Sequence, residues 1–162
     1  MKVLVSACLL GVGCRYDGQS KAYPLLDELC RRHEVVPVCP EIFGGLPTPR
    51  VPAERQGERV VTKTGGDVTA EYRRGAGEAV RLAQTLGCTV AVLKERSPSC
   101  GSGQVYDGTF TGTLTEAWPS DQSRGLSPNA SGGLTPLSPP SELQEIPVAT
   151  REQSGLLCFH SR

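Results

Sequence analysis

Apolar residues gather in three short runs in the first two thirds of the chain. The runs are "KVLVSACLL" (residues 2–10), "EVVPVCPE" (34–41) and "CTVAVLKE" (88–95), and each is rich in Val or Leu. Such short runs are typical of strands that are buried on both faces of a sheet. We interpret the first run as a strand rather than as a signal peptide, because polar residues follow it at once.

Two stretches between these runs carry apolar residues at helical spacing. The first is "YPLLDELCRRH" (residues 23–33), in which Cys30 falls on the predicted apolar face. The second runs from Asp67, a good N-cap, to Gly87, which matches the common C-terminal glycine of helices. Its predicted apolar face consists of Val68, Tyr72, Ala76, Val80, Ala83 and Leu86.

The alternation of strands and helices predicts an α/β fold, a small Rossmann-like and mainly parallel sheet with helices. Proline and glycine make "GGLPTPRVPAE" (residues 44–54) a predicted loop, and "ERVVTKTGGD" (58–67) is predicted as a short strand or edge ribbon. "QVYDGTFTGTL" resembles a hairpin that turns at Asp107-Gly108. The alternative is an α+β layer in which this hairpin lies at the edge of the sheet.

The character of the chain changes after about Leu114. Residues 115–162 are rich in Pro and Ser and show no sustained period of a strand or a helix. We therefore predict an α/β domain over residues 1–114 and an irregular, disordered tail over residues 115–162.

The charge of the chain is balanced, with 17 basic and 17 acidic residues. A net charge of zero argues against a nucleic-acid polymer or an anionic membrane as partner, although a small nucleobase stays compatible with it. No apolar run is long enough to span a membrane, so we expect a cytoplasmic protein. Seven cysteines in a reducing compartment favour metal binding or catalysis over disulfides.

Three cysteines follow the ends of the three predicted strands. Cys8 and Cys39 lie at the carboxyl ends of the first and second predicted strands, and Cys100 lies in the turn "SPSCG" just after the third. Ligands of open α/β sheets bind at the carboxyl ends of the strands. We therefore predict that these thiols meet at one site, with Cys14, in the same loop as Cys8, as a further candidate.

The other cysteines have simpler interpretations. Cys30 and Cys88 lie in apolar patterns and are predicted to be core residues, while Cys158 lies in the tail without a predicted partner. Neither His33 nor His160 accompanies the candidate thiols. Three or four thiolates without histidine favour zinc or an iron–sulfur cluster. The absence of paired Cys-x₂₋₄-Cys spacings favours iron–sulfur, and the alternative is a set of thiols without a metal.

Four ordered motifs resemble a small bacterial family of thiouracil desulfidase-like iron–sulfur enzymes. They are "SACLLGVGCRYDG", "VCPEIFGGLPTPRVPAE", "GGDVTAEYRRGA" and "AVLKERSPSCGSGQVYDGTFTG", and the resemblance spans about residues 3–114. It implies a [4Fe–4S] cluster held by three cysteines, and non-redox removal of sulfur from a thiolated nucleobase such as 2-thiouracil or a related thioamide. The sulfur would be captured as hydrosulfide on the open iron.

The resemblance also implies roles for individual residues. Cys8, Cys39 and Cys100 match the cluster ligands, with Cys14 as the alternative to Cys8. Glu41 matches the acid–base carboxylate and Ser97 the active-site serine. A carboxylate two residues from a ligand can deprotonate the attacking water, which agrees with this assignment.

Two more residues are candidates for binding the substrate, namely Arg50 and Ser99. Arg50 and Glu54 would either contact the substrate or close a salt bridge over the pocket.

The tail departs from the family pattern, which continues after this point with a helix and a strand. A reading-frame change near residue 115 is one hypothesis for the departure. The alternative functions are a non-catalytic metal or redox module and an inactive relative. The motifs leave the oligomeric state open.

Overall fold

The computed structural model describes residues 1–101, 103–117, 134–136 and 156–161. Its main sheet has five strands in the order β2-β1-β5-β9-β8. The strands are β1 (Lys2–Ser6), β2 (Glu34–Val38), β5 (Val90–Lys94), β8 (Leu134–Pro136) and β9 (Leu156–Ser161). β1 is parallel to β2 and β5, whereas β9 is antiparallel to β5 and β8. The three predicted strands are thus the parallel part of the sheet, with β2 at its edge, which confirms the α/β fold.

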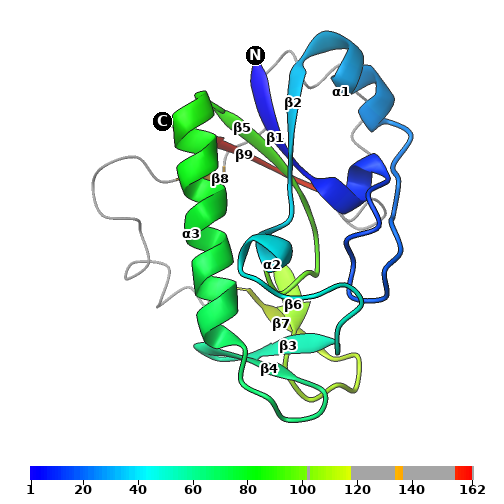
Figure 1. The fold of residues 1–162 in the computed structure, drawn as a ribbon, viewed down its shortest axis with the longest axis vertical. Helices are drawn as coiled ribbons and strands as arrows, with labels where there is room; N and C mark the ends of the chain where they lie inside the picture. Colours follow the sequence, from blue (N-terminus) through cyan, green and yellow to red (C-terminus); the bar gives the residue numbers. More distant parts are fainter. Residues whose placement is uncertain (102, 118–133, 137–155, 162) are drawn as a thin grey trace.

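Helices cover the sheet on both faces (Figure 1). On one face, Val3 and Val5 pack with α1 (Leu26–Arg32), and on the other Leu4 packs with α3 (Thr69–Leu86). Adjacent strand residues serve opposite cores because side chains alternate across a strand. Both faces of β1 and β5 are therefore buried, as continuous apolar runs predict. The same prediction is wrong for most of β2, in which only Val38 is buried, because β2 is an edge strand.

The first strand is shorter than the predicted run of residues 2–10. It ends at Ser6, and Ala7–Leu10 form the 3₁₀ helix η1. Gly11 ends η1 in the left-handed conformation with φ 95°, which glycine adopts without strain. Cys8 therefore lies on a helical turn just beyond the carboxyl end of β1.

The prediction that Cys30 is a core residue is wrong. In α1 the buried residues are Leu26 and Leu29, and Cys30 is exposed. Cys30 lies about 100° around the helix from Leu29, which carries it past the buried stripe. Cys88 is buried, as predicted.

α3 differs from its prediction at its start and in its apolar face. The helix begins at Thr69, and the Asp67 carboxylate accepts a hydrogen bond from the Thr69 N–H at 2.9 Å without being the N-cap residue. Gly87 ends the helix in the left-handed conformation, as predicted. The buried face consists of Tyr72, Gly75, Ala79 and Ala83, whereas Ala76 and Val80 are exposed.

Close contact with the short helix α2 (Pro40–Phe43) explains this buried face. A Cβ on Gly75 would lie 1.8 Å from the Pro40 carbonyl oxygen, and a Cβ on Gly44 would lie 2.1 Å from the Glu71 carbonyl oxygen. The two backbones can approach this closely only where both positions are glycine. The contact turns the Gly75 side of α3 inward and fixes the place of α2.

Two antiparallel ribbons lie below the main sheet in the view of Figure 1, on the side of α2. One pairs β3 (Ala53–Gln56) with β4 (Arg59–Thr62), and the other pairs β6 (Gln104–Tyr106) with β7 (Leu114–Glu116). The predicted hairpin therefore exists, but as a separate sheet and without a two-residue turn at Asp107-Gly108. Its longer loop is held by the Glu54 carboxylate, which accepts hydrogen bonds from the N–H groups of Gly108 and Phe110 at 3.0 and 2.9 Å.

The predicted tail is described only in part. Residues 134–136 and 156–161 are strands of the main sheet. Residues 118–133 and 137–155 lie outside the described residues. The hypothesis of a reading-frame change concerns this same region and stays a prediction.

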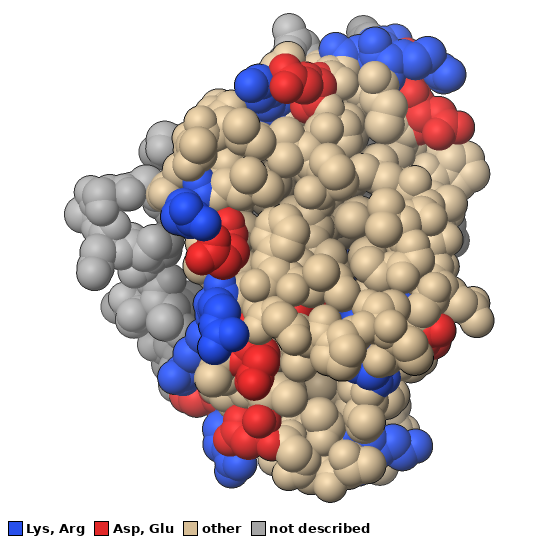
Figure 2. All heavy atoms as spheres, viewed as in Figure 1, with Lys and Arg blue, Asp and Glu red and all other residues tan. Residues whose placement is uncertain are grey.

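Charged side chains alternate in sign along the exposed face of α3, and few charges lie on the neighbouring face in the same view (Figure 2).

No helix among the described residues is long and apolar enough to span a bilayer.

Candidate active site

The carboxyl ends of the three parallel strands meet at a cavity of about 980 Å³. Cys8 reaches it from η1 after β1, Cys39 from the residue after β2, and Cys100 from the turn after β5. Chain direction brings them together, because β1, β2 and β5 are parallel and therefore end on the same edge. The structure thus brings together the three thiols that were predicted to meet.

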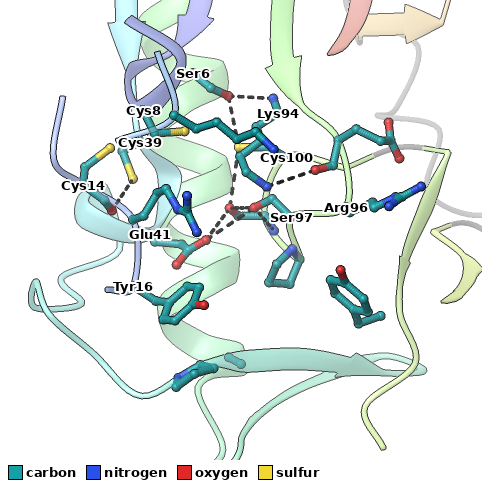
Figure 3. A pocket seen from close by; sticks show the side chains of 18 of the residues that line it. Ser6, Cys8, Cys14, Tyr16, Cys39, Glu41, Lys94, Arg96, Ser97 and Cys100 are labelled. Atoms are coloured by element: carbon teal, nitrogen blue, oxygen red, sulfur yellow. Dashed lines mark hydrogen bonds between the residues drawn. The ribbon is translucent and has the colours of Figure 1, made fainter. Parts of the chain in front are cut away.

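Cys14 also lines the cavity. The loop after η1 folds back, and the Cys39 thiol contacts the Cys14 carbonyl oxygen at 3.9 Å (Figure 3). Both Cys14 and Cys8 are buried. Cys30 and Cys88 do not line the cavity. The structure therefore retains Cys14 as an alternative to Cys8.

Burial weakens the acidity of these thiols. Desolvation raises the pKa of Cys100 to about 11, against the opposing effect of hydrogen bonds from Ser6 and Ser99. Desolvation, together with the nearby thiols of Cys39 and Cys8, raises the pKa of Cys14 to about 12. Desolvation also raises the pKa of Cys8. Thiolates at this site therefore need a bound cation to be stable.

Within the described part of the chain, no group of three or more His, Cys, Asp or Glu side chains is arranged to hold one metal ion. The cavity of about 980 Å³, which four cysteines line, has room for a larger group such as an iron–sulfur cluster, and cysteine thiolates are the usual ligands of such a cluster.

Arg50 and Glu41 form a buried ion pair beside the thiols. The Arg50 Nη2 and Nε atoms lie 2.6 and 2.7 Å from Glu41 Oε2, and only 7% of the Arg50 side chain is exposed. Arg50 Nη2 also donates to the Cys14 carbonyl oxygen at 2.9 Å. The predicted salt bridge over the pocket thus exists, with Glu41 as the partner. Glu54 instead binds the hairpin loop.

Two serines contact the second oxygen of Glu41. Ser99 Oγ donates to Glu41 Oε1 at 2.9 Å, and Ser97 Oγ lies 3.5 Å from the same oxygen. The two hydroxyls lie 3.0 Å apart. A tight turn holds them, in which the Gly101 N–H donates to the Ser97 carbonyl oxygen at 2.8 Å. Glu41, Ser97 and Ser99 therefore form one network, in which Ser99 makes the shorter contact.

Three further residues of the cavity wall were not singled out from the sequence, namely Ser6, Tyr72 and Lys94. Tyr72 reaches the cavity from α3, and burial, followed by the charge of Glu41, raises its pKa well above its usual range. Burial lowers the pKa of Lys94, which ends β5. The sequence feature that could have identified Ser6 and Lys94 is a polar residue within an apolar run, as in "VLVSA" and "AVLKE".

The fold and the cavity define a class of protein, an α/β enzyme whose strand ends offer several thiols, a carboxylate and two hydroxyls to one ligand. A family model described as 2-thiouracil desulfurase matches residues 3–118. The chain therefore belongs to the 2-thiouracil desulfurase family, which confirms the resemblance inferred from its motifs.

Two relatives agree with this membership. The chain is 42% identical over 120 residues to the uncharacterized protein YbbK of Bacillus subtilis (strain 168), over 68% of this chain and 80% of YbbK. It is 52% identical to a solved structure of a [4Fe–4S]-dependent thiouracil desulfidase, TudS. That alignment has a TM-score of 0.68 and covers 76% of this chain and 83% of the TudS chain.

Proposed function

We propose that this protein is a [4Fe–4S]-dependent desulfidase that converts a thiolated nucleobase, such as 2-thiouracil, into the oxo base. The balanced reaction is R₂C=S + H₂O → R₂C=O + H₂S, with no net oxidation or reduction. The observation that carries the proposal is the meeting of buried thiols with the Glu41, Ser97 and Ser99 network at one cavity. Membership of the family and the likeness to TudS support it.

Cys8, Cys39 and Cys100 are the proposed ligands of the cluster. Each follows a different strand, and Figure 3 shows Cys8 and Cys39 close together with Cys100 on the side of Ser97. Cys14 is the alternative to Cys8. When bound, a cluster held by these cysteines would supply an open iron with affinity for the soft sulfur of the substrate and for the hydrosulfide product.

Glu41 is the proposed acid–base group. Arg50 occupies Oε2 at 2.6 Å, which holds the carboxylate in place and leaves Oε1 as the oxygen that faces the serines. We propose that Oε1 takes the proton of the water that attacks the C=S carbon. A carboxylate whose Oε2 is held by two nitrogens of one arginine needs little reorganisation for this transfer.

Ser97 and Ser99 are the proposed contacts to the substrate ring. Their hydroxyls lie 3.0 Å apart and can donate to or accept from a ring nitrogen or the developing oxygen. Ser97 is the proposed active-site hydroxyl. Ser99 contacts both Glu41 Oε1 and Cys100 Sγ, so it joins the carboxylate to the thiol side. Arg50 acts in this proposal through Glu41 rather than by binding the substrate.

Anaerobic reconstitution followed by assay with 2-thiouracil tests the function. We expect about four irons and four sulfides per chain, and equal amounts of sulfide and uracil as products. Glu41→Gln should keep the iron content and lower the rate by about 10²–10⁴-fold, because it loses the proton acceptor. Glu78→Gln is the matched control, because this half-exposed carboxylate on α3 lies outside the cavity wall.

One equivalent of zinc, without release of sulfide, would overturn the proposal and favour a non-catalytic metal module. A fully loaded cluster without any turnover would favour an inactive relative.

A further inference from the structure

Ser6 is a buried hydroxyl at the end of an apolar strand. It is 2% exposed, less than the side chains of Arg50 and Glu41. The preceding residues of β1, Val3 to Val5, are buried and apolar. A hydroxyl in such surroundings loses its hydration, and this cost is offset only where its hydrogen bonds are made inside the protein.

Both hydrogen-bonding functions of Ser6 have partners. The backbone N–H of Lys94 donates to Ser6 Oγ at 3.0 Å, and Ser6 Oγ donates to Cys100 Sγ at 3.5 Å (Figure 3). A backbone N–H can only donate, so Ser6 Oγ is the acceptor in the first contact. The proton of the hydroxyl is therefore free to point at the sulfur. The neighbouring strand β5 thus fixes the hydroxyl in a donor orientation.

The second hydroxyl near Cys100 has competing acceptors. Ser99 Oγ lies 3.6 Å from Cys100 Sγ, but it also lies 2.9 Å from Glu41 Oε1 and 3.0 Å from Ser97 Oγ. Ser99 has one proton, and an ionised carboxylate is the stronger acceptor. Among the described residues, Ser6 is thus the hydroxyl whose proton has Cys100 as its acceptor without competition.

We propose that Ser6 is a positioning residue that donates a hydrogen bond to the Cys100 thiolate when Cys100 ligates the cluster, and thereby tunes the iron. The inference rests on the proposed function. A donor withdraws electron density from the thiolate sulfur, which stabilises the more reduced cluster and raises its reduction potential. The same withdrawal makes the open iron a better acceptor for the substrate's sulfur.

The test is a redox titration of the loaded protein, followed by its electron paramagnetic resonance signal. Ser6→Ala should shift the midpoint potential of the cluster to a more negative value, with iron and sulfide content unchanged. Thr62→Val is the matched control, because Thr62 Oγ1 also accepts a backbone hydrogen bond, from Gly66 N–H at 2.8 Å, but lies outside the cavity wall. Its potential should equal that of the unaltered protein. Ser6→Thr keeps a hydroxyl, so its midpoint potential should lie close to that of the unaltered protein.

An unchanged potential in a fully loaded Ser6→Ala variant would overturn the inference. If that variant does not fold or does not bind the cluster, the role of Ser6 is tested on the unaltered protein instead. Its reduced cluster should show an exchangeable proton coupling that disappears in ²H₂O and is retained in Ser6→Thr, and absence of this coupling also overturns the inference. Iron content and sulfide release report on the proposed function separately, so a protein that loads and turns over but shows no shift refutes only the role of Ser6.

Discussion

The cavity has two walls that differ in how their polar groups are satisfied. The thiol wall consists of Cys8, Cys14, Cys39 and Cys100, and the carboxylate wall consists of Glu41, Arg50, Ser97 and Ser99. In the thiol wall burial raises the pKa of three of the thiols, and the contacts to sulfur are 3.5 Å or longer. In the carboxylate wall both oxygens of Glu41 have contacts of 2.9 Å or less.

This difference shows which wall is complete without a cofactor. Arg50 and the serines already hold Glu41, so the protein alone orients the acid–base group. Buried, weakly acidic thiols become stable thiolates only when a metal cluster is bound. The following predictions test this contrast, from the largest expected effect to the smallest.

Removal of a thiol from the thiol wall should abolish loading of the cluster. Cys100→Ala should reduce iron and sulfide to background, because a ligand is lost, whereas Cys30→Ala should keep about four of each per chain. Cys30 is the matched control because it is an exposed cysteine on α1. Iron and sulfide analysis after anaerobic reconstitution measures both. Equal iron content in the two variants would refute the ligand assignment.

The thiol wall of the cluster-free protein should react slowly with alkylating reagents. With a pKa of about 11, only about one in a thousand Cys100 side chains is a thiolate at pH 8. Because the pKa is raised, the rate of alkylation should climb about tenfold per pH unit from pH 8 towards pH 11. Mass spectrometry of anaerobically alkylated protein measures each site, with exposed Cys30 as the reference. Modification of Cys100 as fast as Cys30 at pH 8 contradicts the contrast between the walls.

The carboxylate wall depends on the backbone contact between α2 and α3. Gly75→Ala places a methyl group 1.8 Å from the Pro40 carbonyl oxygen and should cost about 3 kcal/mol of unfolding free energy. Gly77→Ala has no atom within 4 Å and should instead stabilise the helix by about 0.5–1 kcal/mol. Urea unfolding of both variants measures the difference. Similar midpoints for the two would show that α2 does not rest on α3.

Loss of the buried ion pair should impair the reaction but leave the thiol wall intact. Arg50→Met should lower kcat/KM by roughly 10–100-fold, because Glu41 is no longer oriented, while the iron content stays unchanged. Arg59→Met removes an exposed pair with Asp67 and serves as the control, since exposed pairs contribute little. Steady-state sulfide release measures both. An unchanged rate in Arg50→Met would show that Glu41 does not need its arginine.

The sequence was most informative where local pattern and topology agree. The three apolar runs predicted the parallel strands, and the carboxyl ends of those strands predicted where Cys8, Cys39 and Cys100 would meet. The family of the chain also followed from its motifs. These inferences succeed because strand burial and strand direction are encoded in residues that are close together along the chain.

Long-range contacts account for what the sequence did not predict. The ion pair of Arg50 with Glu41, the role of Glu54 at the hairpin loop and the exposure of Val80 each depend on which elements pack together. Ser6 had no visible role until β5 placed the Lys94 N–H and Cys100 beside it.

The sequence by itself determined the α/β order of elements, the thiols at the strand ends and the family. Only the tertiary structure decided how the two walls meet at one cavity. The physical reason is that apolar periodicity is a local property. A hydrogen bond such as Ser6 to Cys100, across 94 positions of the chain, exists only after the sheet has formed.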